Sequence, residues 1–208
     1  YTREETKAIV QMAVEHDLWI LDDMIYSTLV WNEGGYTSPC AFEGGSVRTV
    51  TIGGWSKGWA MTGWRLGWIT ASPQVMDGVK KINVSSATHV ATFLMPAAET
   101  ALGLTQELEV MNESFRNRRT IAHEAFSSLP GVVVPEPEGA FYILCDITGT
   151  GMTDIEFATL ALEEAQVQVI PGSLMKGGEG LIRVSYATSL ENIHEGVKRL
   201  KEWLENRT

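Results

Sequence analysis

Lys57 and Arg65 lie in a stretch rich in Gly and Trp, which reads Ser-Lys-Gly-Trp-Ala-Met-Thr-Gly-Trp-Arg-Leu-Gly over residues 56–67. Apolar surroundings disfavour the charged form of a lysine amine, and a neutral amine can form an imine with an aldehyde. Arginine presents a planar fork that binds a phosphate through two parallel hydrogen bonds. Together these two side chains suit a phosphorylated aldehyde cofactor.

The same stretch also satisfies a hydrolase motif. Gly-Trp-Ser-Lys-Gly at 54–58 matches G-x-S-x-G and follows an apolar run, as a nucleophile elbow would. An elbow must lead into a helix that packs on the sheet, and Gly63 and Gly67 interrupt any helix at this point. The sequence therefore disfavours a serine hydrolase.

Two further segments carry polar side chains next to apolar runs. Asp-Asp-Met-Ile-Tyr at 22–26 follows the apolar run 18–21, and Gly-Glu-Gly-Leu-Ile-Arg-Val-Ser-Tyr-Ala occupies 178–187. Taken alone, Asp23 and Tyr26 favour a turn aspartate and a core tyrosine. Arg183 alone could equally be a surface charge on a strand.

Taken together, these motifs resemble those of the fold-type I pyridoxal phosphate enzymes, and specifically of the class I/II aminotransferases related to aspartate aminotransferase. The stretch 56–67 is similar to the family's S-K-x-x-x-M-T-G-W-R-L-G, 22–26 to S-D-E-I-Y, and 178–187 to G-E-G-x-I-R-L-S-Y-A. The resemblance covers residues 1–207 but only the C-terminal half of a family member. It implies transfer of an amino group between an L-amino acid and a 2-oxo acid.

The resemblance also implies a role for each site residue. Lys57 would be the Schiff-base lysine and proton shuttle, and Ser56 and Arg65 would bind the cofactor, Arg65 through its phosphate. Asp23 would keep the pyridine nitrogen protonated, so that the ring accepts electrons from the substrate Cα, and Tyr26 would donate to the ring's 3-oxygen. Arg183 would bind the substrate's α-carboxylate and orient the reacting bond. Asp22 and Met24, where the family often has Ser and Glu, are not expected to contact the ring.

Other activities share these residues. A pyridoxal phosphate lyase or synthase of the same fold would carry the same lysine and acid. A non-catalytic aminotransferase-like sensor domain, or a truncated fragment, is a third alternative. The product distinguishes a lyase, which releases ammonia, from a transaminase, which needs a second oxo acid.

The elements that must position these residues indicate an α/β fold. We expect residues 1–112 to be the C-terminal part of the cofactor-binding large domain, with a mixed, mainly parallel sheet, and residues 113–208 to form a small α+β domain. A long helix near 104–128 would link them. Predicted helices are 2–16, 73–82, 153–165 and 189–205, and predicted strands are 18–21, 47–52, 66–71, 132–134, 141–146, 167–170 and 181–186.

The family's first half, with its glycine-rich phosphate turn and the aromatic residue that stacks on the ring, has no counterpart in this sequence. Strands at 18–21, 47–52 and 66–71 would normally be covered and paired by that half, so apolar surface should be exposed there. We therefore expect residues 113–208 to be the better-folded portion.

Composition limits the partners. The 208 residues carry a formal charge of −10, which disfavours nucleic acid, and no run approaches the ~18 apolar residues of a membrane span. Cys40 and Cys145 lie outside disulfide or zinc spacings, which makes the cytoplasm the default compartment. The four histidines lack metal-ligand spacing, so no metal is expected, and no role is assigned to His89. The family resemblance implies a homodimer.

Overall fold

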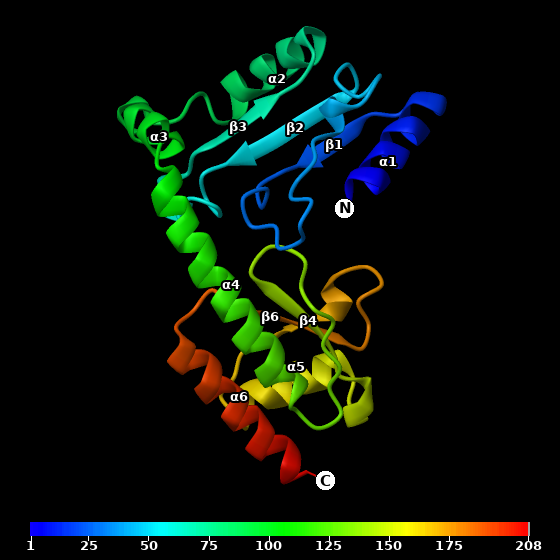
Figure 1. Ribbon diagram of the computed structural model, residues 1–208, viewed down its shortest axis with the longest axis vertical. Coiled ribbons are helices and arrows are strands. Elements are labelled where there is room, and N and C mark those ends of the chain that lie inside the picture. Colours follow the sequence, from blue (N-terminus) through cyan, green and yellow to red (C-terminus); the bar gives the residue numbers. More distant parts are fainter. Residues whose placement is uncertain (208) are drawn as a thin grey trace. The chain divides into compact units, whose positions relative to one another are not determined.

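The computed structural model describes residues 1–207 (Figure 1). Thr208, the last residue of the predicted second domain, lies outside the described residues. The chain divides into two compact units, Tyr1–Val110 and Met111–Thr208. Each unit is described in turn.

The first unit opens with helix α1, Arg3–Glu15. Thr2 caps it, because its side chain accepts from the Glu5 amide while the Glu5 carboxylate accepts from the Thr2 amide. The helix buries Thr6, Val10 and Ala13, which recur at helical spacing and form its inner face. The predicted helix over 2–16 is confirmed.

A three-stranded mixed sheet follows α1 in the order β1-β2-β3. Strand β1 (Ile20–Asp23) pairs in parallel with β2 (Thr49–Gly54), which pairs antiparallel with β3 (Gly67–Thr70). In the parallel register Asp22 lies opposite Thr51 and Asp23 opposite Ile52. Because side chains alternate along a strand, Asp22 and Thr51 lie on one face and Asp23 and Ile52 on the other.

The remaining elements of the first unit are helical. Helix α2 spans Pro73–Ser86, beyond the predicted 73–82, because the helical bonds continue until Thr88 adopts a left-handed φ of 62°. Gly103 separates α3 (Met95–Leu102) from the long α4 (Thr105–Ser127), which runs on into the second unit. Short 3₁₀ turns occupy Pro39–Ala41, Thr62–Trp64 and Thr92–Leu94.

The second unit is an antiparallel sheet with helices. Strand β6 (Leu181–Ser185) lies between β4 (Tyr142–Asp146) and β5 (Ile170–Pro171), and both pairings are antiparallel. Helices α5 (Asp154–Glu163) and α6 (Leu190–Glu205) belong to this unit (Figure 1). Two 3₁₀ turns, Thr148–Thr150 and Gly172–Leu174, lie next to its strands.

One face of this sheet forms the core of the second unit. Ile143, Cys145 and Ile182 are fully buried and pack with α5 and α6 residues such as Phe157 and Leu200. The alternate positions of the strands point to the opposite face. Arg183 therefore lies on the face away from this core.

Three of the predicted strands differ from the structure. The predicted strand 18–21 lies at 20–23 as β1, so Asp22 and Asp23 end the strand instead of following it. Residues 132–134 form no strand, since only an isolated bridge joins Val133 to Asp146. The predicted strand 167–170 shortens to β5, because Gln166 adopts a left-handed φ of 56° and the Val167 amide bonds back to Ala161 O at 2.9 Å. Within residues 1–207, no helix combines the length and apolar character needed to cross a membrane.

Candidate active site

The carboxyl ends of β1 and β2 bring the predicted acid and lysine to the same edge of the sheet. Asp23 is the last residue of β1, and Lys57 lies three residues after the end of β2. The Met24 amide continues the pairing past the strand end by donating to Ile52 O at 2.9 Å. In open α/β sheets, ligands bind outside the carboxyl ends of parallel strands.

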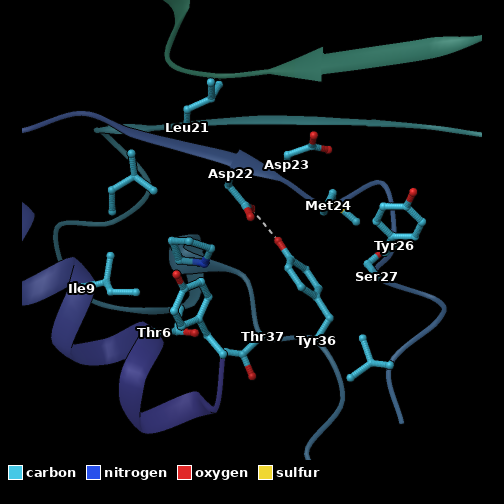
Figure 2. Close-up of a pocket in the computed structure, with 14 residues that line it drawn as sticks. Thr6, Ile9, Leu21, Asp22, Asp23, Met24, Tyr26, Ser27, Tyr36 and Thr37 are labelled. Carbon is cyan, nitrogen blue, oxygen red and sulfur yellow. Dashed lines mark hydrogen bonds between the residues drawn. The ribbon is translucent and has the colours of Figure 1, made fainter. Parts of the chain in front are cut away.

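The two adjacent aspartates at the end of β1 have different environments (Figure 2). Asp22 accepts hydrogen bonds from the Tyr36 hydroxyl at 2.5 Å and from Thr51 Oγ1 at 3.4 Å. Burial of the ring and this bond to Asp22 raise the pKa of Tyr36, so the phenol stays a neutral donor. Asp22 is thus engaged on the α1 side of the sheet.

Asp23 leaves the strand on the opposite side from Asp22 (Figure 2). Its Oδ1 accepts from the Ile25 amide at 3.2 Å, which starts the turn that carries Tyr26. Asp23 is exposed, and it lines a cavity of about 440 Å³ together with Tyr26, Asp22 and Tyr36. The residues that line this cavity do not include Lys57 or Arg65, so the cavity does not join the predicted acid to the predicted lysine and arginine.

Lys57 lies in a turn that is closed by hydrogen bonds between the turn's own residues. The Ala60 amide donates to Lys57 O and the Met61 amide to Trp55 O, both at 3.1 Å. Thr62 Oγ1 donates to Ser56 O at 2.6 Å. Ser56 and Lys57 are half-buried, so the turn holds both residues between the sheet and solvent.

Arg65 ends this turn with a strained backbone. Its φ is 56°, in the left-handed region that bulky residues rarely adopt. Its Nη1 donates to Thr62 O at 2.9 Å, and the side chain remains exposed. Strain of this kind persists only where the surroundings impose it, and it concentrates at ligand sites.

Two glycine contacts join the lysine turn to the segment that follows β1. A Cβ on Gly58 would lie 2.1 Å from Thr28 Oγ1, and a Cβ on Gly54 would lie 3.4 Å from Ile25 Cδ1. The turn beside Lys57 therefore packs directly on the segment that holds Tyr26. Sequence reasoning does not single out Thr28, because its importance comes from a neighbour distant in the chain.

The structure contradicts the hydrolase alternative. After Ser56 the chain runs through turns and the 3₁₀ segment Thr62–Trp64 into β3, so no helix follows the serine. A nucleophile elbow needs that helix. Across residues 1–207, no three His, Cys, Asp or Glu side chains cluster in a way that could bind a metal ion.

Arg183 belongs to the second unit, where an aromatic ring orients it. Its guanidinium carbon lies 4.7 Å from the centre of the Tyr142 ring, at the start of β4. Tyr142 in turn contacts Phe141, which stacks on Phe115 of α4 with ring centres 5.6 Å apart. Sequence reasoning missed this role for Tyr142, although a paired-strand register would have placed it two pairs away from Arg183, on the same face of the sheet.

Comparison with known proteins gives a consistent result. The family model for aminotransferases of class I and II matches residues 1–200. An aspartate aminotransferase of Pyrococcus abyssi is 36% identical over 206 residues, which cover 97% of this chain and 53% of that protein. An aromatic-amino-acid aminotransferase of Thermococcus litoralis is also 36% identical and covers 99% of this chain. These names favour amino-group transfer over the lyase and sensor alternatives.

Comparison with solved structures also finds aminotransferases. The crystal structure of an aromatic aminotransferase from Pyrococcus horikoshii OT3 superposes with a TM-score of 0.94 at 35% identity, covering 100% of this chain and 56% of that one. The chain spans about half the length of the relatives it matches. It belongs to the class I and II aminotransferase family.

Proposed function

We propose that this chain supplies the lysine-bearing half of a pyridoxal 5'-phosphate-dependent aminotransferase, which transfers an amino group between an L-amino acid and a 2-oxo acid. One observation carries the proposal. Asp23 ends β1 and the turn that holds Lys57 follows β2, so both lie at the carboxyl ends of two parallel strands, and Gly58 packs that turn against Thr28.

The residues present fit the cofactor in chemical type. An amine, a carboxylate, a phenol and a guanidinium match an aldehyde, a pyridine nitrogen, a ring oxygen and a phosphate respectively. The strained Arg65 backbone beside the lysine turn supports a phosphate-binding role, since strain of this kind is typical of ligand sites. When bound, pyridoxal phosphate supplies a conjugated ring that accepts the electrons released at the substrate's Cα.

Each side chain then has a defined task. The Lys57 amine holds the cofactor and, when displaced by substrate, takes and returns the proton at Cα. The Asp23 carboxylate keeps the pyridine nitrogen protonated, and the Tyr26 hydroxyl donates to the ring's 3-oxygen. Ser56 and Arg65 hold the cofactor, with Arg65 on its phosphate.

We assign Arg183 to the α-carboxylate of the substrate. Its guanidinium is oriented by the Tyr142 ring on the sheet face away from the core. A guanidinium fixed in one plane can bind a carboxylate through two parallel bonds and so orient the substrate's Cα. Relatives named for aspartate and for aromatic amino acids make both side-chain classes candidates for the donor.

We also propose that the working protein is a cytoplasmic homodimer. Cys40 and Cys145 are both free, as a reducing compartment would leave them. The homodimer is what the resemblance to the class I and II aminotransferases implies. Light scattering on the purified protein would measure its mass, and a monomer would contradict the dimer.

Borohydride reduction in the presence of pyridoxal phosphate tests the lysine. We expect the cofactor to become covalently attached to the peptide that contains residue 57, and Lys57→Ala to abolish the label. Lys80→Ala is the matched control, because Lys80 is an exposed lysine on α2 of the same unit. Label retained in Lys57→Ala would rule out Lys57. The experiment applies equally to the chain and to any longer protein that contains it.

A further inference from the structure

Two tryptophans flank Lys57 and bind the same helix. Trp55 Nε1 donates to Ala98 O at 3.1 Å, and Trp59 Nε1 donates to Ala101 O at 2.9 Å. Each tryptophan lies two residues from Lys57, one on either side. The lysine turn is thus attached to α3 at two points that bracket the proposed catalytic amine.

The acceptors on α3 suit this attachment. Ala101 lies in the last turn of α3, and its carbonyl oxygen accepts from the Leu104 amide at 3.2 Å as well as from Trp59 Nε1. Ala98 lies three residues earlier, which places both carbonyls on the same side of α3. Both alanines are 5% exposed, and their small side chains allow the indole rings to approach the backbone.

The two indole rings also contact each other. Their centres lie 6.4 Å apart, with the planes inclined at 50°, within the range of favourable aromatic pairs. The two rings therefore pack as a pair, and together they attach the backbone on both sides of Lys57 to α3. We call Trp55, Trp59 and their two acceptors the indole clamp.

The backbone of the lysine turn is strained, so contacts with other segments of the chain must stabilise it. Ala60 has a φ of 52° and Arg65 one of 56°, so two residues without glycine's freedom lie in the left-handed region. Such a backbone conformation is unfavourable unless the surroundings compensate for it. Gly58 packs on Thr28 from one side, and the indole clamp holds the turn through α3.

We propose that Trp55 and Trp59 are positioning residues, whose hydrogen bonds to α3 fix the backbone on both sides of Lys57 and thereby direct its amine at the cofactor. This inference rests on the function proposed for Lys57. It assigns to the two indole N–H groups a role that ring packing alone does not require.

Trp55→Phe, Trp59→Phe and the double variant test the clamp, because phenylalanine keeps an aromatic ring and removes the N–H donor. Trp64→Phe is the control, since Trp64 is 43% exposed and lies in the same stretch of chain. Three quantities are measured on the full chain: the rate of cofactor attachment at Lys57, the pH at which the cofactor's absorption band changes, and hydrogen exchange of residues 55–66.

One net hydrogen bond is worth about 1 kcal/mol, which corresponds to about a fivefold change. We expect each single variant to slow attachment about fivefold and to speed exchange of residues 55–66 by a similar factor. The absorption midpoint should move in both single variants and stay in place in Trp64→Phe. A change in general stability alone would leave that midpoint unmoved.

The outcomes separate the clamp from the proposed function. Wild-type rates, midpoint and exchange in the double variant would overturn the clamp while the lysine assignment stands. If a protein that contains this chain together with the family's N-terminal half takes no label, the proposed function fails, and exchange of residues 55–66 then decides the clamp. Unchanged exchange in the double variant would overturn it in that case also.

Discussion

Gly58 packs against Thr28 so closely that a Cβ placed on the glycine would lie 2.1 Å from the threonine Oγ1 and 3.3 Å from its Cβ. The two residues are thirty positions apart in the sequence. One follows Lys57 and the other follows Tyr26 by two, so this contact joins two of the proposed catalytic residues through the backbones that carry them.

Gly58→Ala should therefore destabilise the first unit. An extra methyl in a packed contact typically costs about 1–3 kcal/mol. Thr28 Oγ1 is buried and has no hydrogen-bond partner among residues 1–207, so Thr28→Ala removes the atom in conflict without breaking a bond. The double variant should recover most of the loss in urea unfolding. Additive effects of the two changes would show that the contact is not the cause.

The sequence predicts the elements that carry the site and most of their order. Periodicity locates α1 and α5, and Thr2 with Glu5 is a local cap that the structure reproduces; the second cap, Thr153 with Glu156, is a signal of the same kind that the structure adds. Motifs indicate Lys57 and Asp23 as chemical residues. Both kinds of signal are short-range, which is why a single sequence displays them.

The contacts that hold the site together cannot be predicted from such short-range signals, because they join residues far apart in the sequence. Trp59 reaches Ala101 across 42 positions, and the Tyr36 hydroxyl reaches Asp22 across 14. Val133 illustrates the opposite error, since a β-branched run predicts a strand where one bridge forms. Tertiary packing decides such cases.

The two cysteines should differ sharply in reactivity. Burial raises the pKa of the Cys145 thiol to about 12, whereas Cys40 is exposed. At pH 8 iodoacetamide should modify Cys40 and leave Cys145 unmodified until the chain unfolds, as mass spectrometry of the peptides would show. Modification of both thiols at similar rates in the folded protein would contradict the buried position of Cys145.

The raised pKa of the Cys145 thiol makes the stability of the fold depend on pH in the alkaline range. The unfolded thiol ionises near its ordinary value of 9.0, and the folded thiol only near 12. The unfolded chain therefore releases this proton first as pH rises, so the contribution to stability is complete below pH 9 and is lost between 9 and 12.

Asp154 should make the second unit sensitive to acid. This residue is 5% exposed, and its Oδ2 accepts from the Ser173 amide at 2.7 Å. Hydrogen bonds from Ser173, together with one from the Gly180 backbone, hold the pKa of Asp154 below its usual 3.8. Its contribution to stability is therefore present above pH 3.8 and is lost as pH falls through the lowered value.

Asp154→Asn tests this assignment. The amide cannot carry the charge, so the variant should unfold at lower urea concentration at pH 7 and approach the unaltered protein below pH 3. Glu163→Gln is the matched control, because Glu163 is an exposed carboxylate at the end of the same helix and its removal should leave the urea midpoint unchanged. Equal urea midpoints for Asp154→Asn and the unaltered protein at pH 7 would refute the role.

Tyr142 should affect substrate affinity through Arg183, if Arg183 binds the α-carboxylate as proposed. The ring centre lies 4.7 Å from the guanidinium carbon, and a cation–π contact of this kind is worth about 0.5–1 kcal/mol. Tyr142→Leu should raise KM for the amino acid about two- to fivefold, whereas Tyr142→Phe keeps the ring face and should stay close to the unaltered value. A rise in KM of equal size in both variants would assign the effect to the hydroxyl instead.

The two units should also differ in stability, and hydrogen exchange measures this. The main cluster of buried side chains, from Ala122 to Leu204, lies wholly in the second unit. In the first unit, by contrast, Trp19 is 61% exposed and Leu21 70%, on or next to the sheet that carries Asp23. Fewer buried apolar contacts lower the free energy of local opening.

We therefore expect amides of β1 and β2 to exchange faster than those of β4 and β6, although both sets are hydrogen-bonded in strands. The comparison is made on the isolated chain by mass spectrometry at one pH and temperature. Addition of pyridoxal phosphate should slow exchange in β1 and β2 selectively, because a ligand that binds only the folded unit stabilises it by mass action. Equal protection of both pairs before addition would show that the exposed apolar face does not weaken the first unit.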